Sequence, residues 1–300
     1  MVIVRFRGGL GNQLFQCAFC LKLKERDIEV YIDKTEYRLA PHSYTQVEDV
    51  FYVNFEMATN KEIEECADYW PPRFGGYVGN YIYTHKNNII SNRIKKNGHK
   101  PTHIYEEDFK NLDIDEIVNF LSGDNKNYYL DGYWQENKYY IGCERLCFKE
   151  EFEEKYRKEI NDIQYRNSCS IHIRRGDYIN SDYDILNLEY YEKAIKIIRN
   201  KYGDNITFYV FSDNIKEAEA FLNQGKDVKT LQLKFFDETI DSSARDLLLM
   251  SKCANNIIAN STYSFWAAEL NSNKDKIVVA PKYFKKDRTF KTLRDEWIKL

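Results

Sequence analysis

The chain has 300 residues, a length that suits one large domain or two of medium size. Hydrophobic residues make up 43% of it and the formal net charge is −3, which argues against a disordered chain and against a globally basic nucleic-acid binder. No stretch approaches the roughly 18 apolar residues of a membrane span, and arginines and glycines interrupt any N-terminal signal sequence. We therefore expect a soluble, cytoplasmic protein.

The seven cysteines do not form a metal-binding framework. Cys17-x-x-Cys20 lacks a second pair at the spacing that a zinc site needs. Both cysteines fall on the apolar segment that follows the first glycines. We therefore expect buried free thiols and a reducing compartment.

The first half of the chain opens as a βαβ unit. Residues 2–6 are predicted to be a strand, 8–12 a loop, 13–25 a helix and 29–33 a second strand. From about residue 35 to residue 126 the pattern is irregular, with short helices. Residues 150–166 then predict one charged amphipathic helix that connects the two halves.

Apolar strands alternate with helices in the second half. The predicted strands are residues 168–174, 207–212, 256–260 and 276–281, and the predicted helices are 187–202, 215–222, 243–254 and 261–270. This alternation is typical of a parallel, doubly wound sheet covered on both faces. Ligands of such sheets bind at the carboxyl ends of the strands, where Arg174, Asp213 and Ser261 are expected.

Two adjacent arginines follow the strand 168–174, in the stretch Arg174-Arg175-Gly176-Asp177. Strand alternation sends neighbouring side chains to opposite faces, so one guanidinium could bind a phosphate in a bidentate manner while the other braces the loop against Asp177. The alternative is a purely structural ion pair with Asp177. His172, within the strand, is either a half-buried and hydrogen-bonded histidine or a ligand contact.

Each polar residue at the following strand ends also has a structural alternative. Ser261 and Thr262 open a helix, where they either cap it or present its N-terminal N–H groups to an anion. Asp246 either favours a helix dipole or accepts two hydrogen bonds from guanine. Asp213 is either a ligand contact or the N-cap of the next helix.

The stretch "GGLGNQ", which begins at Gly8, fits neither familiar phosphate loop, because it has no third glycine at Rossmann spacing and no Gly-Lys-Ser/Thr. Its glycines allow close approach of a ligand, and Asn12 and Gln13 could bind hydroxyls. A nicotinamide enzyme, with Asp33 on the ribose, is disfavoured by the same spacing. The triplets Asp113-x-Asp115 and Asp182-x-Asp184 are of a kind that arises by chance among 47 acidic residues, so no metal is predicted.

Three motifs together, "GGLGNQLFQ", "HIRRGDY" and "IIANSTYSFWAA", resemble the α-1,2-fucosyltransferase family in order and separation. The resemblance implies an α/β, GT-B-like fold with two Rossmann-type halves facing a central cleft. Residues 1–150 would form the acceptor-side domain with the glycine-rich loop, and residues 151–300 the domain that binds GDP-fucose. Phe265 before Trp266 departs from the family's Trp-Trp pattern, which implies a change of packing.

The resemblance also implies the chemistry: inverting, metal-independent transfer of L-fucose from GDP-β-L-fucose to the 2-hydroxyl of a terminal β-galactoside. Arg174, the implied pyrophosphate ligand, is a candidate catalytic residue together with Arg175 and Asp177. The general base stays open: Asp177 and Asp182 are nearest the donor loop, and a dissociative transition state would need no strong base. The implied donor-site and cleft residues are Gly9, Gly11, Asn12, His172, Arg174, Asp213, Asp246, Ser261 and Thr262. No cofactor is expected.

The implied partners are GDP-fucose and a galactose-containing glycan, with a lipid-linked acceptor and peripheral membrane contact both compatible and nucleic acid not expected. Tyr133 and Trp134 could stack on the acceptor, with Gln135 and Glu136 on its hydroxyls, or all four could serve packing. Three alternatives stay open: another GDP-sugar, another fucosyl linkage, or a non-catalytic nucleotide or glycan binder.

Overall fold

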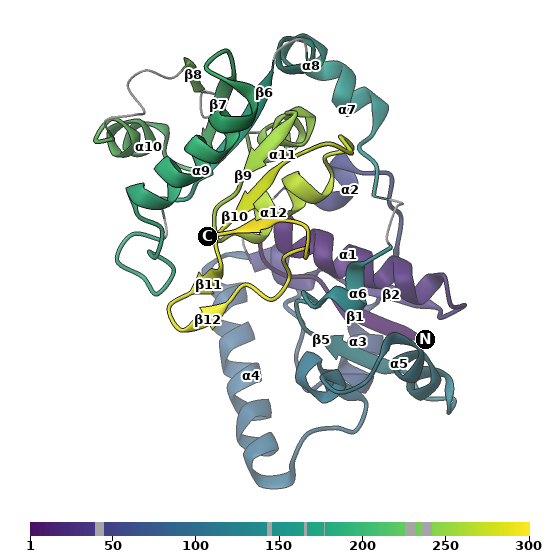
Figure 1. Cartoon of the computed structure of the whole chain (residues 1–300). Helices are drawn as coiled ribbons and strands as arrows, with labels where there is room; N and C mark the ends of the chain where they lie inside the picture. Colours follow the sequence, from purple (N-terminus) through teal and green to yellow (C-terminus); the bar gives the residue numbers. More distant parts are fainter. Residues whose placement is uncertain (40–44, 143–145, 165–166, 177, 226–231, 236–241) are drawn as a thin grey trace. The chain divides into compact units, whose positions relative to one another are not determined.

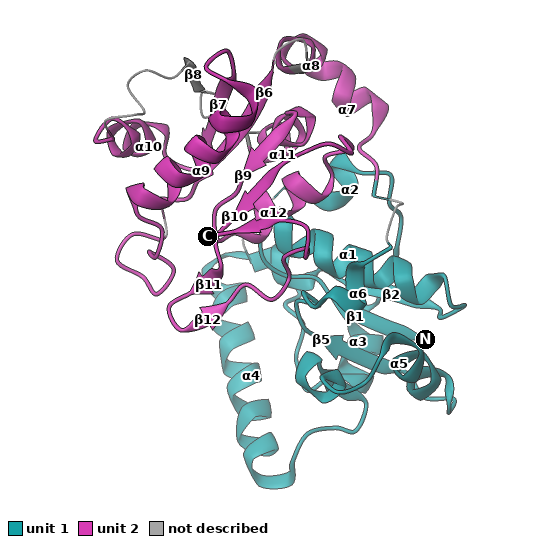
Figure 2. Cartoon of the chain, in the orientation of Figure 1, with its two compact units in different colours: residues 1–146 teal, residues 147–300 magenta. Residues whose placement is uncertain are grey.

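The computed structural model describes residues 1–39, 45–142, 146–164, 167–176, 178–225, 232–235 and 242–300. The chain divides into two compact units, Met1–Leu146 and Cys147–Leu300 (Figure 2). The division lies close to the boundary at residue 150 that the sequence suggested. Each unit contains its own parallel sheet covered by helices (Figure 1).

The first unit is built on a five-stranded sheet in the order β3-β2-β1-β5-β4, with every pairing parallel. Its strands are β1 (Val2–Arg5), β2 (Val30–Asp33), β3 (Glu56–Met57), β4 (His103–Tyr105) and β5 (Tyr128–Asp131). Its helices are α1 (Leu10–Lys24), η1 (Thr35–Leu39), α2 (Val47–Val50), α3 (Asn60–Cys66), α4 (Gly76–Asn97), η2 (Glu106–Phe109), α5 (Ile114–Ser122) and α6 (Asn137–Tyr140). The predicted βαβ opening is confirmed.

The second unit is built on a six-stranded sheet in the order β13-β10-β9-β6-β7-β8, again parallel throughout. Its strands are β6 (Ser168–Ile173), β7 (Thr207–Ser212), β8 (Gln232–Phe235), β9 (Asn255–Ile257), β10 (Val278–Ala280) and β13 (Ile298–Lys299), and β11 (Tyr283–Lys285) and β12 (Arg288–Thr289) form a separate antiparallel hairpin. Its helices are α7 (Glu150–Lys155), α8 (Arg157–Gln164), α9 (Leu188–Tyr202), α10 (Ile215–Leu222), α11 (Ser242–Lys252) and α12 (Thr262–Glu269). The predicted doubly wound sheet is confirmed, whereas the single helix predicted over residues 150–166 is two helices that part at Tyr156.

The central strand β6 shows why both faces of this sheet are covered. Cys169, Ile171 and Ile173 pack with residues of α9 and α10 in one apolar cluster. The alternate residues Ser170 and His172 point to the opposite face, where Ser170 Oγ accepts a hydrogen bond from Asn256 Nδ2. A strand buried on both faces favours apolar or hydrogen-bonded side chains, and Cys169, Ile171, Ile173 and Ser170 follow that pattern.

The described cysteines are free thiols, and all but one of them are buried. Cys17 and Cys20 are buried free thiols on α1, as predicted. Burial raises the pKa of Cys169 and Cys253 well above the usual thiol range. Among the described cysteines Cys147 alone is exposed, and it is the first residue of the second unit.

None of the helices in the described part of the chain has an apolar stretch long enough to cross a bilayer.

Candidate active site

The loops that follow β6, β7 and β9 meet at one edge of the second sheet. These strands are neighbours in the order β9-β6-β7, and all run parallel, so their carboxyl ends lie side by side. Arg174 follows β6 and Asp213 follows β7, and Arg174 Nε lies 3.2 Å from Asp213 Oδ2. The two predicted site residues are therefore an ion pair.

Asp213 also holds the backbone of the arginine loop. Its Oδ1 accepts the N–H of Arg175 and its Oδ2 that of Gly176, each at 2.9 Å. A Cβ on residue 176 would lie 2.5 Å from Asp213 Oδ2, so only glycine allows this approach. The expectation that Asp213 caps the next helix is wrong, because Asn214 caps α10 by accepting the N–H of Glu217.

The side chains of the two arginines diverge. Arg174 is partly exposed, at 31%, and its guanidinium lies 5.6 Å from the ring centroid of Tyr178. Arg175 turns instead to Asp184, with 3.4 Å from Nη1 to Oδ1, and to the ring of Phe221 on α10 at 5.0 Å. Asp184 thus braces the loop. Asp177, predicted as the partner of an arginine and as a catalytic residue, lies outside the described residues.

His172 is buried next to Arg174. It is 3% exposed, so the expectation of a half-buried histidine is wrong, and its Nδ1 has no hydrogen-bond partner among the described residues. Burial, together with the neighbouring Arg174 guanidinium, lowers the pKa of His172 to about 3. The imidazole therefore stays neutral over the physiological pH range and adds no charge to the site.

Tyr263 and Arg245 are site residues that sequence reasoning missed. The Tyr263 ring lies 5.4 Å from that of His172, and its hydroxyl donates to the carbonyl of Ser243 at the start of α11. Burial raises the pKa of Tyr263 well above its usual value, and the nearby Asp246 carboxylate adds to the shift. The stretch "NSTYS" drew attention to its hydroxyl residues, and nothing in the sequence singled out the ring that follows.

Asp246 is buried in an ion pair with its chain neighbour. Arg245 Nε and Nη2 both lie close to Asp246 Oδ1, at 2.9 Å and 2.8 Å, and the two residues are 9% and 8% exposed. Because α11 begins at Ser242, Asp246 lies one turn inside the helix rather than at its start. The predicted contact of Asp246 with guanine stays a prediction.

Ser261 caps α12, as its position predicted. Its Oγ accepts the N–H of Tyr263 at 3.3 Å, and Thr262 is the first residue of the helix. Asn260, just before the cap, accepts a hydrogen bond from Tyr178 Oη through its carbonyl, at 3.2 Å. The loop after β6 and the start of α12 are thereby tied together. Phosphate binding by Ser261 and Thr262 stays a prediction.

The loop in the glycine-rich stretch of the first unit is shorter than the predicted loop over residues 8–12. Helix α1 begins at Leu10, so Gly11 and Asn12 lie in its first turn and Gly9 is its N-cap. The residue that requires glycine is Gly8, with φ +81° and a Cβ position 2.6 Å from Asn12 Nδ2. Asn12 Oδ1 accepts a hydrogen bond from Gln135 Nε2 at 3.2 Å, within the same unit.

Gln13 serves the fold rather than a ligand. It is buried, its Nε2 donates to the carbonyl of Thr45 at 2.9 Å, and its Oε1 accepts the N–H of Val47 at 3.0 Å. These contacts fix the start of α2 against α1. The Gln13 amide of "GGLGNQ" is therefore explained by hydrogen bonds within the fold rather than by a ligand.

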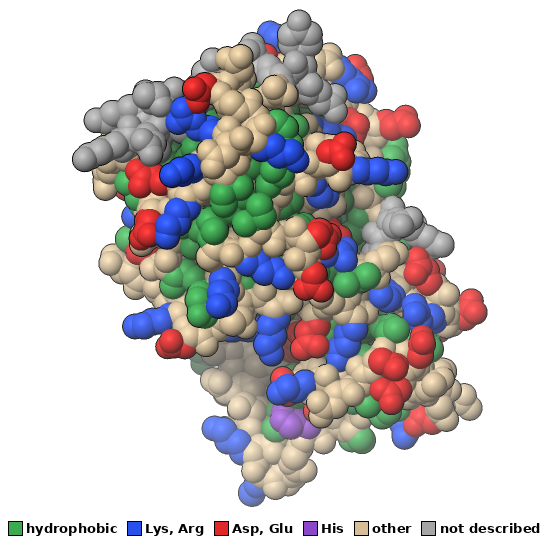
Figure 3. Space-filling model, viewed as in Figure 1, with side chains coloured by type: hydrophobic (Ala, Val, Ile, Leu, Met, Phe, Trp, Pro, Cys, Tyr) green, Lys and Arg blue, Asp and Glu red, His purple; other side chains and the backbone are tan. Residues whose placement is uncertain are grey.

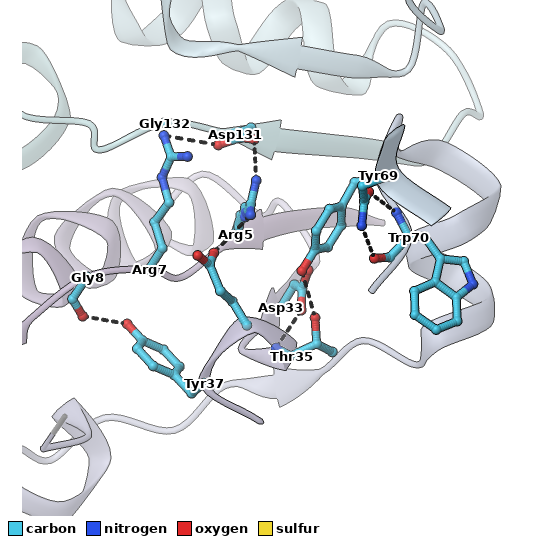
Figure 4. Close-up of polar contacts among 12 residues, drawn as sticks. Arg5, Arg7, Gly8, Asp33, Thr35, Tyr37, Tyr69, Trp70, Asp131 and Gly132 are labelled. Atoms are coloured by element: carbon cyan, nitrogen blue, oxygen red, sulfur yellow. Dashed lines mark hydrogen bonds and ion pairs between the residues drawn. The ribbon is translucent and has the colours of Figure 1, made fainter. Parts of the chain in front are cut away.

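A cluster of charges closes the carboxyl edge of the first sheet (Figure 4). Arg5, at the end of β1, lies between Asp131 at 2.8 Å and Glu36 at 2.9 Å, and Arg7 Nη2 lies 3.3 Å from the other oxygen of Asp131. Burial alone would raise the pKa of Asp131, but His103, Arg5 and Arg7 outweigh it and hold that pKa well below its usual value. At this edge, these charges neutralise one another.

The aromatic segment after β5 is divided between packing and surface. Trp134 is fully buried and stacked on Phe19 with 4.3 Å between ring centroids, so its predicted stacking on a sugar is wrong. Tyr133 is 37% exposed, with the Arg7 guanidinium 4.5 Å from its ring centroid. Asp33, the weak ribose candidate, is buried and accepts the hydroxyl of Tyr129 at 2.8 Å.

The acidic triplets have structural contacts. Asp113 is the N-cap of α5 in a capping box with Glu116, and Asp184 pairs with Arg175. Across the described residues no three His, Cys, Asp or Glu side chains are grouped so that they could hold a metal ion.

Comparisons with known proteins agree with this architecture. The family model for glycosyl transferase family 11 matches residues 1–300. The O-antigen biosynthesis glycosyltransferase WbnK of Escherichia coli is 44% identical over 152 residues, which is about half the length of each protein, at 48% of both. An α-1,2-colitosyltransferase of Escherichia coli is 26% identical over an alignment that covers 100% of this chain and 99% of the relative.

The solved structure of POFUT1 in complex with GDP-fucose is similar over 92% of this chain and 95% of its own, with 14% identity and a TM-score of 0.50. At that identity the likeness concerns the fold, which is the GT-B-like architecture of two α/β units predicted from the sequence. The three sequence motifs, the fold and the match over the full 300 residues agree. The chain belongs to glycosyl transferase family 11, the α-1,2-fucosyltransferase family that its motifs resemble.

Proposed function

We propose that the protein transfers L-fucose from GDP-β-L-fucose to the 2-hydroxyl of a terminal β-galactoside, with inversion and without a metal ion. Two relatives support the proposal: one is named for O-antigen biosynthesis and the other for an α-1,2 transfer. We assign donor binding to the second unit and acceptor binding to the first. A bacterial surface glycan would then be the acceptor.

The observation that carries the proposal is the meeting of Arg174 with the start of α12 at one sheet edge. Arg174 is partly exposed there, and Tyr178 ties its loop to the residue before the helix cap. The first N–H groups of a helix point outward and favour an anion. A guanidinium and a helix N-terminus on neighbouring strands suit a diphosphate, which needs both cationic and N–H contacts.

The reaction follows from that placement. The acceptor oxygen attacks C1 of the fucose from the face opposite GDP, the C1–O bond breaks, and its electron pair goes to the β-phosphate oxygen. Negative charge grows on the leaving diphosphate, where Arg174 and the N–H groups at the start of α12 would stabilise it. The acceptor hydroxyl gives its proton to solvent or to a carboxylate near the donor loop, for which Asp177 and Asp182 are the candidates, and the new linkage has the α configuration.

The remaining site residues have supporting roles in this proposal. Asp213 orients Arg174 by pairing with the arginine Nε, and it also fixes the loop backbone. Asp213 is therefore a positioning residue. Neutral His172 and Tyr263 form the buried floor beside Arg174. Arg175 braces the loop, and Asp177 stays a predicted catalytic residue. Asp246 is proposed to read guanine, held in place by Arg245.

Product analysis tests the proposal. The protein is incubated with GDP-fucose and lactose, with and without a chelator, and the product is analysed for its linkage. We expect fucose α-1,2-linked to galactose and the same rate in both arms. A different linkage would contradict the acceptor assignment. Loss of activity with chelator that magnesium restores would contradict the metal-independent mechanism.

A second candidate is transfer of another GDP-sugar by the same site. The relative named α-1,2-colitosyltransferase, aligned over the whole chain, favours it. A panel of GDP-sugars, each with lactose, separates the candidates by the kcat/KM of GDP release. Binding of GDP without any release from a sugar nucleotide would instead indicate a non-catalytic binder.

A further inference from the structure

The β11–β12 hairpin of the second unit is strongly basic. Between residues 281 and 291 it carries five cations and one acid: Lys282, Lys285, Lys286, Arg288 and Lys291 against Asp287. The whole chain has a formal net charge of −3, so this concentration is local. Figure 3 shows Lys and Arg side chains gathered where Figure 1 places the hairpin.

Within the described part of the chain, these cations have no carboxylate partner. Among the described residues, no Asp or Glu oxygen forms an ion pair with any of the five, although the nearby Lys193 pairs with Glu189 and Arg294 with Glu269. Like charges this close repel one another. A hairpin that holds five such cations together, without described carboxylate partners, is suited to bind a surface that carries many negative charges.

The hairpin is held firmly by its backbone and its apolar side. The N–H of Lys286 donates to the carbonyl of Asp182 at 2.9 Å, and the N–H of Lys282 to that of Leu300 at 2.7 Å. Phe290, which is buried, packs against Phe284 with 4.9 Å between ring centroids. The cations are therefore presented by a fixed scaffold, which lowers the entropy cost of binding.

A cavity of about 420 Å³ opens beside the hairpin, within the second unit. Four lysines, Lys193, Lys282, Lys285 and Lys286, line it with two acids, Glu189 and Asp287, and with apolar residues that include Leu186 and Pro281, so its cations outnumber its acids. Tyr283, also in its wall, is 47% exposed. Lysines around an apolar floor, with an exposed tyrosine, match a group that has a phosphate at one end and hydrocarbon behind it.

We infer that the β11–β12 hairpin docks the second unit on an anionic membrane, with the phosphate headgroup of a lipid in the cavity beside it. The charge complementarity of five unpaired cations supports this occupant, because juxtamembrane basic clusters bind anionic bilayers in this way. A nucleic acid would call for a longer basic stripe than one hairpin, in a chain whose net charge is negative. The inference does not depend on the proposed reaction, and its test measures binding alone.

Vesicle co-sedimentation tests the inference. The full chain is mixed with vesicles of phosphatidylcholine alone and with vesicles that also contain phosphatidylglycerol. We expect binding only to the anionic vesicles, and its loss at about 1 M salt, where the screening length falls to about 3 Å. The variant K282E/K286E/R288E should lower the partition coefficient by about 100-fold or more, since each surface cation contributes about fivefold.

The matched control is K86E/K95E/K96E on α4. This helix is also basic and has no acidic residue, and the three reversals change the net charge by the same amount. We expect the control to keep wild-type binding, and circular dichroism to show both variants folded. Equal losses in both variants, a loss in the control alone, or no binding to anionic vesicles would overturn the inference. So would binding of glycerol phosphate to a protein that ignores the vesicles, which would indicate a small-anion site.

Discussion

The two sheets of this protein end in arginines that meet different surroundings. Arg5, at the end of the central strand of the first unit, is 11% exposed and held by two carboxylates. Arg174, after the central strand of the second unit, is 31% exposed, and its ion pair with Asp213 uses the inner nitrogen of the guanidinium. An arginine at the end of a strand therefore indicates a ligand-binding role only once the carboxylates that pair with its guanidinium are known.

This difference in ion pairing indicates that the edge of the first sheet serves stability and the edge of the second sheet serves the reaction. At the first edge, Asp131 is surrounded by Arg5, Arg7 and His103, so the charges serve stability. At the second edge, Asp213 accepts hydrogen bonds from two backbone N–H groups, those of Arg175 and Gly176, and thereby fixes the loop after β6. We expect substitutions at the first edge to lower stability and substitutions at the second to lower turnover.

Asp131→Ala is the largest expected effect. Removal of Asp131 leaves the buried Arg5 with Glu36 alone and takes from Arg7 its carboxylate among the described residues, which costs about 3–5 kcal/mol of the free energy of unfolding. Urea denaturation measures it. The control is Asp115→Ala, which breaks a 2.9 Å pair with Arg26 at a carboxylate that is 76% exposed and should cost under about 1 kcal/mol. Similar losses in the two variants would mean that the first edge is not a stabilising cluster.

Arg174→Ala should lower kcat with GDP-fucose by about 10²- to 10³-fold, because it removes a fixed contact to the leaving diphosphate. Arg174→Lys should recover little, since an ammonium cannot make the forked contact. Arg199→Ala, which breaks another arginine–aspartate pair in the same unit, is the matched control and should keep wild-type kcat. If Arg174→Ala kept it too, the donor-site assignment would be wrong.

Asp213→Asn should lower kcat about tenfold, because loss of a charge-assisted contact releases Arg174 from its position. A double-mutant cycle with Arg174→Ala makes this prediction sharp. If Asp213 acts through Arg174, its substitution in the Arg174→Ala background should have little further effect. Fully additive losses would show that Asp213 acts on the reaction independently.

The smallest expected effect concerns acid stability at His172. The unfolded chain protonates this histidine near its ordinary pKa of 6.5, whereas the folded chain does so only near pH 3. Its contribution to stability is therefore complete above about pH 6.5 and is lost as the pH falls towards 3. From pH 7 to pH 5.5 the loss should be about 1 kcal/mol. Urea denaturation at both pH values should show that His172→Phe loses that much less than wild type; equal losses would refute the assignment.

The regular second half was readable from the sequence because its strands are buried on both faces and its helices have one apolar face. The strand at residues 207–212 and the helix at 215–222 fall where the structure has β7 and α10. Helix α4 escaped prediction for the opposite reason. Gly79 is its one buried residue, so no apolar stripe marks its 22 residues as a helix.

For the candidate site, the sequence predicted only that polar residues follow several strands, and not how their side chains contact one another. Parallel pairing could suggest that Arg174 and Asp213 lie near each other, but not that Asp213 would bind the loop backbone. The pair Arg245–Asp246 and the ring of Tyr263 depend on how α11 and α12 pack, which one sequence does not show. Trp134 looked like a sugar platform because an aromatic side chain suits both a core and a ligand.

The exposed thiol of Cys147 offers a practical handle. It stands at the first residue of the second unit, while the other described cysteines are buried. With Cys143 changed to serine, a maleimide dye should therefore attach at this one position.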